Sequence, residues 1–419
     1  MIKKLLTLIC LSAGITAYSQ GILPKVEVAG QPSCVHLDEA ALHFPGSREA
    51  QDGFYSLLDS LMAGDGRSVN VWHVGGSHVQ AGHFSYRMQS NLTSMAEGLK
   101  GERGFIFPYR IARTNSDKSF RTSYTGEWES AMAAATHKDF NPRFGIMGIA
   151  ARTSDSLATV GIGLNINGAD SLWQFNRFRV MGYASSPEAY PVLYCGADTL
   201  GFSVDSLTQS YMFNLPGIVD TVTIGFHIPE GETFTLTGTE PISGRKGINY
   251  YCSGVNGAKL TTWLDDCPDL ERDLQIVRPD LAIFAVGIND SACKAVDFHV
   301  ETFKARYRRL ISLIRKLSPD CAFIFITNND SYRYISRGMT YNNNGPTVQK
   351  AMYELAEEFG AAVWDVFAIM GGKDSVIPWR DAGLVKSDRL HFTPEGYVLL
   401  GDLLYNAVID DYNTQHTDN

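Results

Sequence analysis

Two stretches of alternating strand and helix patterns are separated by about 150 residues of different character, and this interruption most constrains the fold. Before residue 101, Phe54, Leu58 and Leu61 recur at helical spacing, and the apolar run Val69–Val74 predicts a buried strand. After residue 250, strand patterns alternate with helix patterns near 297–317 and 347–359; the strands are predicted at Leu281–Val286, Ala322–Ile326 and Ala361–Val366. This alternation predicts an α/β fold, a parallel sheet with helices on both faces, to which both stretches contribute.

The middle region has many Gly, Thr and Ser residues and short alternating runs such as Val219–Ile228 and Thr233–Thr239. Turn signals recur roughly every ten residues, as in a β-sandwich. We therefore expect residues 105–250 to form an inserted β-rich domain, between the two parts of an α/β domain at 20–104 and 251–419.

The first 19 residues read as a signal peptide. Lys3 and Lys4 precede an apolar run from residue 5 to residue 15, which is too short to span a bilayer. Small residues at Ala17 and Ser19 fit cleavage before Gln20, whereas lipidation at Cys10 is disfavoured by Ile9 before it. Later segments contain no apolar run of 18 residues, so we expect a periplasmic or secreted protein without a membrane anchor.

Composition excludes several functional classes. The chain is 44% hydrophobic and 11% aromatic, which argues against disorder, and its formal net charge of −9 argues against a nucleic-acid partner. The cysteines after the leader show no metal-ligand spacing, and we expect free thiols. His73, His78 and His83 recur every five residues, which favours packing or surface roles over metal binding, so we expect no metal and no cofactor.

Ser77 follows the predicted strand directly, in the turn Gly75-Gly76-Ser77-His78. A serine in a tight strand-to-helix turn suits a nucleophile, because the helix N-terminus and the turn amides can stabilise an oxyanion. The G-x-S-x-G elbow does not fit, since Val79 occupies the place of its last glycine. Taken alone, a serine in such a turn is more often a turn or N-cap residue than a nucleophile.

Asp388 and His391 form the only pair of an Asp and a His three residues later. A nucleophilic serine needs a histidine base, and that base needs a carboxylate on its other ring nitrogen. Both roles are available within Asp388-Arg389-Leu390-His391, although a chance pair in a loop is the alternative.

Two further turns offer oxyanion donors. Asn289 follows the strand Leu281–Val286, at the sheet edge where open α/β folds keep their sites. The turn Gly254-Val255-Asn256-Gly257-Ala258 precedes a predicted helix and can offer a backbone N–H, with the choice between its two glycines left open.

In this order the four blocks resemble the SGNH/GDSL hydrolase superfamily, and the strings around Ser77 and His391 resemble those of exported bacterial peptidoglycan O-acetylesterases. The resemblance covers about 200 residues and implies a flavodoxin-like fold. Related enzymes often carry an added β-sandwich that resembles a carbohydrate-binding module, and the resemblance implies the same for residues 105–250. It also implies a triad of Ser77, His391 and Asp388, and an oxyanion hole made by Ser77, Gly257 and Asn289. One departure is Gly76, which stands where the family usually has Asp.

The resulting expectation is an exported serine esterase that removes O-acetyl groups from a polysaccharide, either peptidoglycan or another acetylated glycan. Two alternatives stay open: a lipase or thioesterase of the same superfamily, and a non-catalytic glycan-binding protein whose site has decayed around Gly76. The sequence leaves the oligomeric state and the particular glycan undecided.

Overall fold

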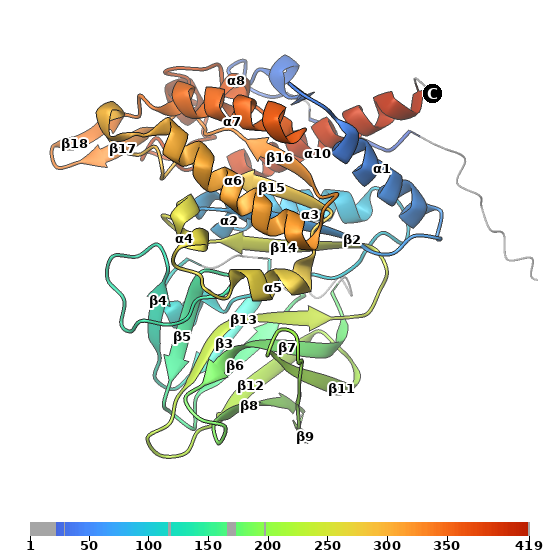
Figure 1. Ribbon diagram of the computed structural model, residues 1–419, viewed down its shortest axis with the longest axis vertical. Coiled ribbons are helices and arrows are strands. Elements are labelled where there is room, and N and C mark those ends of the chain that lie inside the picture. Colours follow the sequence, from blue (N-terminus) through green and yellow to red (C-terminus); the bar gives the residue numbers. More distant parts are fainter. Residues whose placement is uncertain (1–21, 29, 116–118, 166–172, 197, 418–419) are drawn as a thin grey trace, which may run out of the picture.

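The computed structural model describes residues 22–28, 30–115, 119–165, 173–196 and 198–417. The predicted leader and Cys10 lie outside these residues. Figure 1 shows an α/β part, coloured blue, yellow and orange to red, above a green β-rich part. The chain starts in the α/β part, passes through the β-rich part and returns.

A six-stranded sheet in the order β1-β19-β16-β15-β2-β14 organises the α/β part. All neighbouring strands run parallel except β1, which pairs antiparallel with β19 and was not predicted. The strands are β1 (Leu42–His43), β2 (Val69–Gly75), β14 (Ile248–Gly254), β15 (Leu281–Ala285), β16 (Ala322–Ile326) and β19 (Ala362–Trp364). The predicted parallel sheet is confirmed, and β2, from the first stretch, lies between β14 and β15 from the last.

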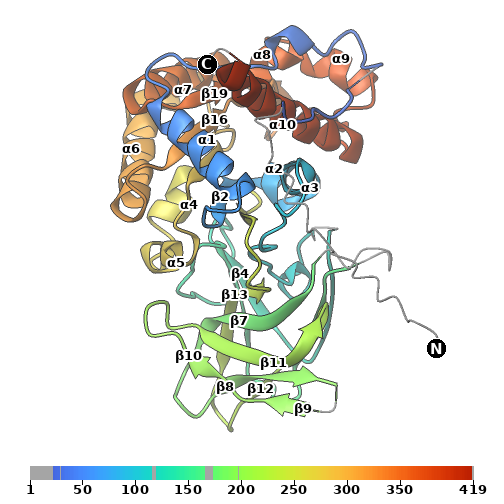
Figure 2. The ribbon, with the colours of Figure 1, turned by 90° about the vertical axis from the view of Figure 1, so that its right-hand side faces the viewer.

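Helices cover both faces of this sheet because its strands are apolar on both sides. In β2, Val69 and Val71 pack toward α1 (Glu49–Met62), α3 (His83–Ser94) and α10 (Pro394–Thr417). On the opposite face, Trp72 and Val74 belong to the core shared with α4 (Leu260–Leu264), α5 (Leu270–Val277), α6 (Val300–Leu317) and α7 (Gly345–Phe359). Figure 2 shows α1, α3 and α10 on their side of the sheet.

Shorter elements lie at the carboxyl ends of the strands. The segment after β2 forms two helices, α2 (Ser77–Gln80) and α3, separated at Gly82, which adopts φ +79°. The left-handed backbone that glycine tolerates redirects the chain there. The remaining elements of this part are α8 (Val366–Met370), α9 (Val376–Asp381) and the hairpin β17 (Tyr332–Ile335) and β18 (Gly338–Tyr341).

The β-rich part is a sandwich of two antiparallel sheets, as predicted. One contains β10 (Ser203–Val204), β11 (Tyr211–Val219), β7 (Phe175–Ala184), β13 (Phe234–Ile242), β5 (Ile149–Thr153) and β4 (Glu129–Met132). The other contains β3 (Arg121–Thr125), β6 (Thr159–Gly163), β12 (Thr221–His227), β8 (Tyr190–Cys195) and β9 (Asp198–Leu200). Rings from the two sheets meet between them, as where Phe226 lies 5.1 Å from Phe234.

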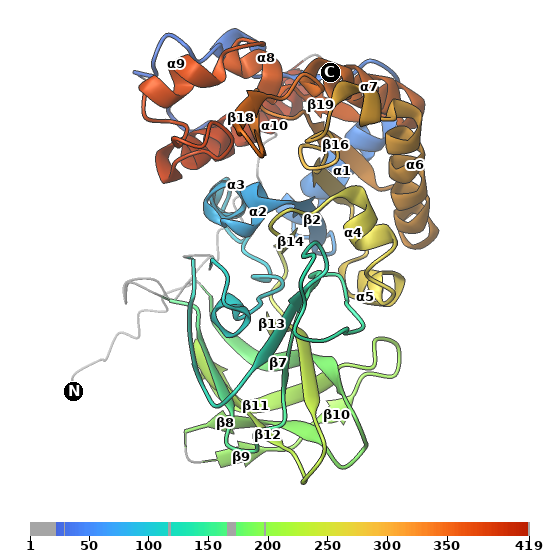
Figure 3. The ribbon, with the colours of Figure 1, turned by 90° about the vertical axis from the view of Figure 1, so that its left-hand side faces the viewer.

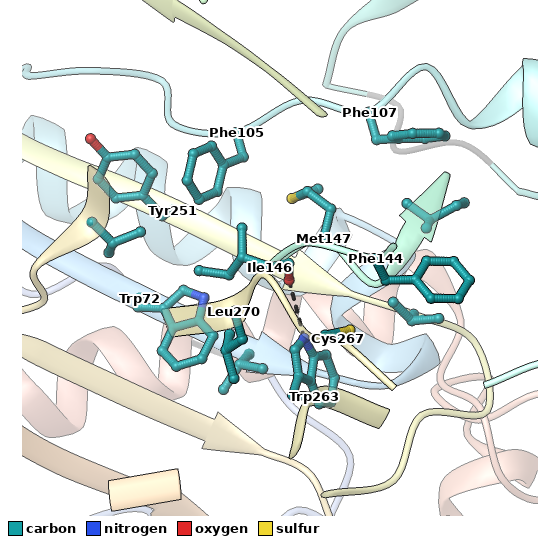
Figure 4. Packing of buried hydrophobic residues seen from close by; sticks show 14 of the residues in the cluster. Trp72, Phe105, Phe107, Phe144, Ile146, Met147, Tyr251, Trp263, Cys267 and Leu270 are labelled. Atoms are coloured by element: carbon teal, nitrogen blue, oxygen red, sulfur yellow. Dashed lines mark hydrogen bonds between the residues drawn. The ribbon is translucent and has the colours of Figure 1, made fainter. Parts of the chain in front are cut away.

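One continuous hydrophobic core joins the two parts (Figure 4). Phe105 and Ile146 from the β-rich region pack with Trp72, Tyr251 and Trp263. Trp263 Nε1 donates to the carbonyl of Ile146 (3.1 Å), so the indole is anchored by its polar edge as well as by its rings. Burying each large apolar side chain stabilises a fold by about 1.5–3 kcal/mol, so these shared contacts contribute to the stability of both parts.

A buried carboxylate on α5 also contacts the β-rich part. Asp273 on α5 is 1% exposed, and its Oδ2 accepts the backbone N–H of Ile146 at 2.9 Å. Burial raises the pKa of Asp273, and Arg272 opposes that effect. The proposed end of the inserted region at residue 250 falls within β14, which already belongs to the α/β sheet.

Two further observations concern the cysteines and the lengths of the helices. The six cysteines in the described residues are all free thiols, with Cys267 and Cys321 buried. Within the described part of the chain, no helix has both the length and the apolar character needed to cross a membrane.

Candidate active site

Ser77 lies at the first position of α2, directly after β2 and Gly76. This is the carboxyl edge of the parallel sheet, which faces the viewer in Figure 3 between the hairpin β17–β18 above and the β-sandwich below. The carbonyl of Gly76 accepts the N–H groups of Val79 and Gln80 (3.1 Å each), which closes the first turn of α2. The turn projects the Ser77 hydroxyl out of the sheet edge.

The Ser77 hydroxyl meets His391, which comes from a loop more than 300 residues later. Ser77 Oγ lies 2.7 Å from His391 Nε2, and His391 Nδ1 lies 2.8 Å from Asp388 Oδ2. The structure thus brings together all three residues of the predicted triad, with each distance inside hydrogen-bonding range.

The loop between Val385 and Phe392 is tightly folded, which holds Asp388 and His391 in place. These two ends form an antiparallel bridge, and Arg389 adopts φ +53° at the tip. Asp388 Oδ1 accepts the N–H groups of Leu390 and His391, each at 3.0 Å. Burial raises the pKa of Asp388, but these bonds and the His391 ring lower it to about 2. Asp388 is therefore a carboxylate at all physiological pH values.

The other two predicted oxyanion donors are Asn289 and Gly257, and Asn289 lies against Gly76, the residue before Ser77. Asn289 Nδ2 donates to the carbonyl of Ala258 at 3.0 Å, which leaves the second hydrogen of the amide for another acceptor. Gly257 is exposed and adopts φ +78°, a conformation that favours glycine. Within the described residues, the backbone N–H groups of Ser77 and Gly257 have no hydrogen-bond acceptor.

Gly76, the departure from the family pattern, lies against Asn289. A Cβ at position 76 would come within 3.1 Å of Asn289 Nδ2, closer than most Cβ contacts. The backbone of Gly76 has φ −83°, so no left-handed conformation requires a glycine. The absence of a side chain at position 76 leaves space for the Asn289 amide, so a glycine here is compatible with the arrangement of the site.

His78 is a site neighbour whose position the sequence did not reveal. Its ring lies 5.5 Å from that of His391, and its Nδ1 lies 2.8 Å from the hydroxyl of Tyr397 on α10. Burial lowers the pKa of His78, which keeps the ring neutral beside His391. An apolar cavity behind His78 is lined by residues such as Phe84, Trp364 and Leu400, but by none of the three triad residues.

His73 on β2 is fully buried, so the packing role expected for it is confirmed. Its Nδ1 lies 2.8 Å from the hydroxyl of Tyr250, and burial lowers its pKa to about 3. An unfolded histidine titrates near 6.5, so between these values the unfolded chain binds a proton that the folded chain does not. The free energy of unfolding must therefore fall as the pH drops from about 6.5 toward 3.

We expect His73→Asn, which keeps a polar atom near Tyr250, to weaken this acid sensitivity. The slope of unfolding free energy against pH, measured by urea denaturation, should decrease by up to about 1.4 kcal/mol per pH unit within this window. The exposed His137 provides the control, as His137→Asn should leave the slope unchanged. An unchanged slope in His73→Asn would contradict the assignment.

The chain is similar to known proteins in part of its sequence and in its fold. Residues 235–399 match the GDSL-like lipase/acylhydrolase family, and a solved structure titled "Peptidoglycan O-acetylesterase in action" superposes with a TM-score of 0.72. The chain has the SGNH hydrolase fold. That structure is 19% identical in sequence, and the superposition covers 89% of this chain and 99% of the other, so the SGNH fold and the β-rich insertion are shared. The predicted resemblance and fold class are confirmed.

Two other solved structures superpose over less than half of this chain. An acetyl xylan esterase is 17% identical over 38% of this chain and 81% of its own, with a TM-score of 0.31. A carbohydrate esterase of family 3 from Talaromyces cellulolyticus is 14% identical over 41% of this chain and 77% of its own, with a TM-score of 0.29. Among curated proteins, the sequence has no match. The family match contains Gly257, Asn289, Asp388 and His391 but begins after Ser77.

Proposed function

We propose that this protein is an exported serine esterase that removes O-acetyl groups from a polysaccharide, either peptidoglycan or another acetylated glycan. The observation that carries the proposal is the unbroken chain of contacts from Ser77 Oγ to His391 Nε2 (2.7 Å) and from His391 Nδ1 to Asp388 (2.8 Å). Serine hydrolases on unrelated folds use this arrangement.

In the proposed first half-reaction, Ser77 Oγ attacks the ester carbonyl carbon while its proton moves to His391 Nε2. The carbonyl oxygen becomes an oxyanion, stabilised by the N–H groups of Ser77 and Gly257 and by Asn289 Nδ2. Asp388 orients the His391 ring and stabilises its protonated form. The tetrahedral intermediate then collapses, the sugar oxygen leaves with the proton from His391, and the acetyl group stays on Ser77.

In the second half-reaction, water takes the place of the sugar hydroxyl. His391 Nε2 accepts a proton from the water as its oxygen attacks the acetyl carbon, and the same donors stabilise the second oxyanion. Collapse releases acetate and returns the proton to Ser77 Oγ. The described residues contain no cluster of His, Cys, Asp or Glu suited to hold a metal ion, and the proposed chemistry requires none.

Three parts of the proposal concern where the enzyme acts. The leader at 1–19 would direct export to the periplasm or the medium, while 20–104 and 251–419 would form the hydrolase domain. The region 105–250 would help to present a polymeric substrate. The resemblance to a peptidoglycan O-acetylesterase over nearly the full length supports an acetylated glycan as substrate.

A substrate panel tests the proposal. We expect the purified protein to release acetate from at least one of O-acetylated peptidoglycan, xylan and pectin, and to hydrolyse p-nitrophenyl acetate faster than long-chain p-nitrophenyl esters. The Ser77→Ala variant serves as the inactive control. A preference for long acyl chains would instead indicate a lipase or thioesterase, and glycan binding without acetate release would indicate a non-catalytic binding protein.

A further inference from the structure

Gln80, the last residue of α2, is 1% exposed and lies three residues after Ser77. Its side chain contacts two segments that are far away in the sequence. The Nε2 atom lies 3.1 Å from Thr114 Oγ1 and 3.1 Å from both oxygens of Asn115, at the start of the β-rich region. The Oε1 atom accepts the backbone N–H of Asn256 at 2.7 Å. Since that N–H can only donate, the orientation of the Gln80 amide is determined.

Asn256 immediately precedes Gly257, the proposed oxyanion donor, in the loop 254–258. Its own side-chain amide donates to Thr114 Oγ1 (3.2 Å) and to Asn115 Oδ1. Gln80, Asn256, Thr114 and Asn115 therefore form one hydrogen-bonded cluster. The backbone and side chain of Asn256 are both held by partners outside the loop.

Several contacts hold the loop 254–258 around Gly257, and the N–H of Val255 also donates to the carbonyl of Gly75 (3.2 Å). At its start, Gly254 packs so closely on α2 that an added Cβ would lie 2.3 Å from the backbone nitrogen of Gln80. In its middle, Gln80 Oε1 holds the N–H of Asn256. At its end, Asn289 Nδ2 donates to the carbonyl of Ala258. Gly257 lies between the last two contacts, and its exposed, left-handed backbone makes no hydrogen bond through its own N–H within the described residues.

We propose that Gln80 is a positioning residue that aims the N–H of Gly257 at the developing oxyanion, with Thr114 and Asn115 of the β-rich region completing its support. The inference rests on the proposed function, because it assigns a role within that oxyanion hole. Gln80 and Ser77 share one helical turn, so the same short helix sets the nucleophile and the donor relative to each other. A misplaced donor weakens transition-state stabilisation more than substrate binding.

The test compares Gln80→Met with Gln89→Met. Methionine has a similar length and no group that accepts the N–H of Asn256. Gln89 is the matched control, since it is also fully buried and donates to the carbonyl of Arg103 (3.0 Å), but from α3 and away from the loop. For acetyl esters we expect Gln80→Met to lower kcat by about 10–100-fold with KM changed less than about threefold. Gln89→Met should leave both constants within about twofold of the unmodified protein.

Two readouts separate positioning from a general loss of structure. Inhibition by methylboronic acid, which forms a tetrahedral adduct on the serine, should weaken in Gln80→Met in proportion to kcat. Gln80→Glu keeps an acceptor for Asn256 but places an anionic oxygen near the oxygens of Asn115, so its kcat should lie between those of Gln80→Met and the unmodified protein.

A second variant is used if Gln80→Met does not fold. Thr114→Val removes a partly exposed hydroxyl shared by Gln80 and Asn256 and should lower kcat by about 3–10-fold with KM unchanged.

Labelling of Ser77 by a fluorophosphonate tests the inference without a glycan substrate. If no glycan releases acetate but the probe labels Ser77, the proposed substrate class fails while the Gln80 comparison continues with the probe. Labelling should then be slower in Gln80→Met than in Gln89→Met. Equal labelling rates and equal kcat in these two variants, or a rise in KM alone, would overturn the positioning role.

Discussion

Ser77→Ala is expected to lower kcat for acetyl esters by roughly 10⁴-fold or more while leaving the fold intact. The substitution removes the oxygen that lies 2.7 Å from His391 Nε2, so the base has no hydroxyl to deprotonate and no acetyl-enzyme can form. Residual hydrolysis would come from water attack assisted by the oxyanion donors. Initial rates with p-nitrophenyl acetate, together with mass spectrometry for an acetylated serine, measure both consequences.

Ser85→Ala is the matched control for this experiment. Ser85 is buried on α3, eight residues after Ser77 and outside the triad, and its hydroxyl donates to the carbonyl of Gly82 (3.4 Å). It should retain nearly full activity. A folded Ser77→Ala protein that kept more than a tenth of the normal kcat would refute Ser77 as the nucleophile.

Asn289→Ala carries the second largest expected effect, a fall in kcat of about 10²–10³-fold with little change in KM. The amide has one hydrogen committed to the carbonyl of Ala258 and a second available for another acceptor, and its nitrogen lies against Gly76. A donor that meets the oxygen only when it becomes negatively charged stabilises the transition state more than bound substrate. Steady-state kinetics on an acetyl ester separate the two constants.

Asn70→Ala tests whether the loss is specific to the site. Asn70 also donates from Nδ2 to a backbone carbonyl, that of Val277 at 2.7 Å, but it lies at the amino end of β2. This variant should keep its kcat even if it is less stable. An Asn289→Ala enzyme with higher KM and normal kcat would make Asn289 a substrate-binding residue instead.

The sequence predicts the α/β elements well because their signals are local. The apolar run Ala322–Ile326 coincides with β16, and the stripe containing Phe303, Tyr307 and Leu310 lies on the buried face of α6. The two-residue strand β1 was missed, because it pairs antiparallel with β19 and carries no pattern of its own. Pairing of that kind depends on a partner about 320 positions away rather than on local propensity.

For the site, the sequence indicates the residues that carry the chemistry but not the residues that hold them in position. Ser77, Asp388 and His391 are recognisable because their types and spacing carry the chemistry. Gln80 showed no signal, since a glutamine at the end of a short helix is ordinary until the chain brings Asn256 against it. Similarly, the choice between Gly254 and Gly257 depends on shape: Gly254 packs on α2, whereas Gly257 is exposed with φ +78°.

The position of β2 within the sheet determines when its neighbouring strands become available during synthesis. Both neighbours of β2, namely β14 and β15, follow the entire β-rich region in the sequence. At roughly 5–20 residues per second of synthesis, β2 emerges about ten seconds or more before either neighbour exists. Until residues 248–285 are available, β2 can form neither of its two native pairings, and Val71 and Trp72 lack the strands beside which they are buried in the folded protein. The sheet of the α/β part therefore cannot form around β2 until the whole β-rich region has been synthesised.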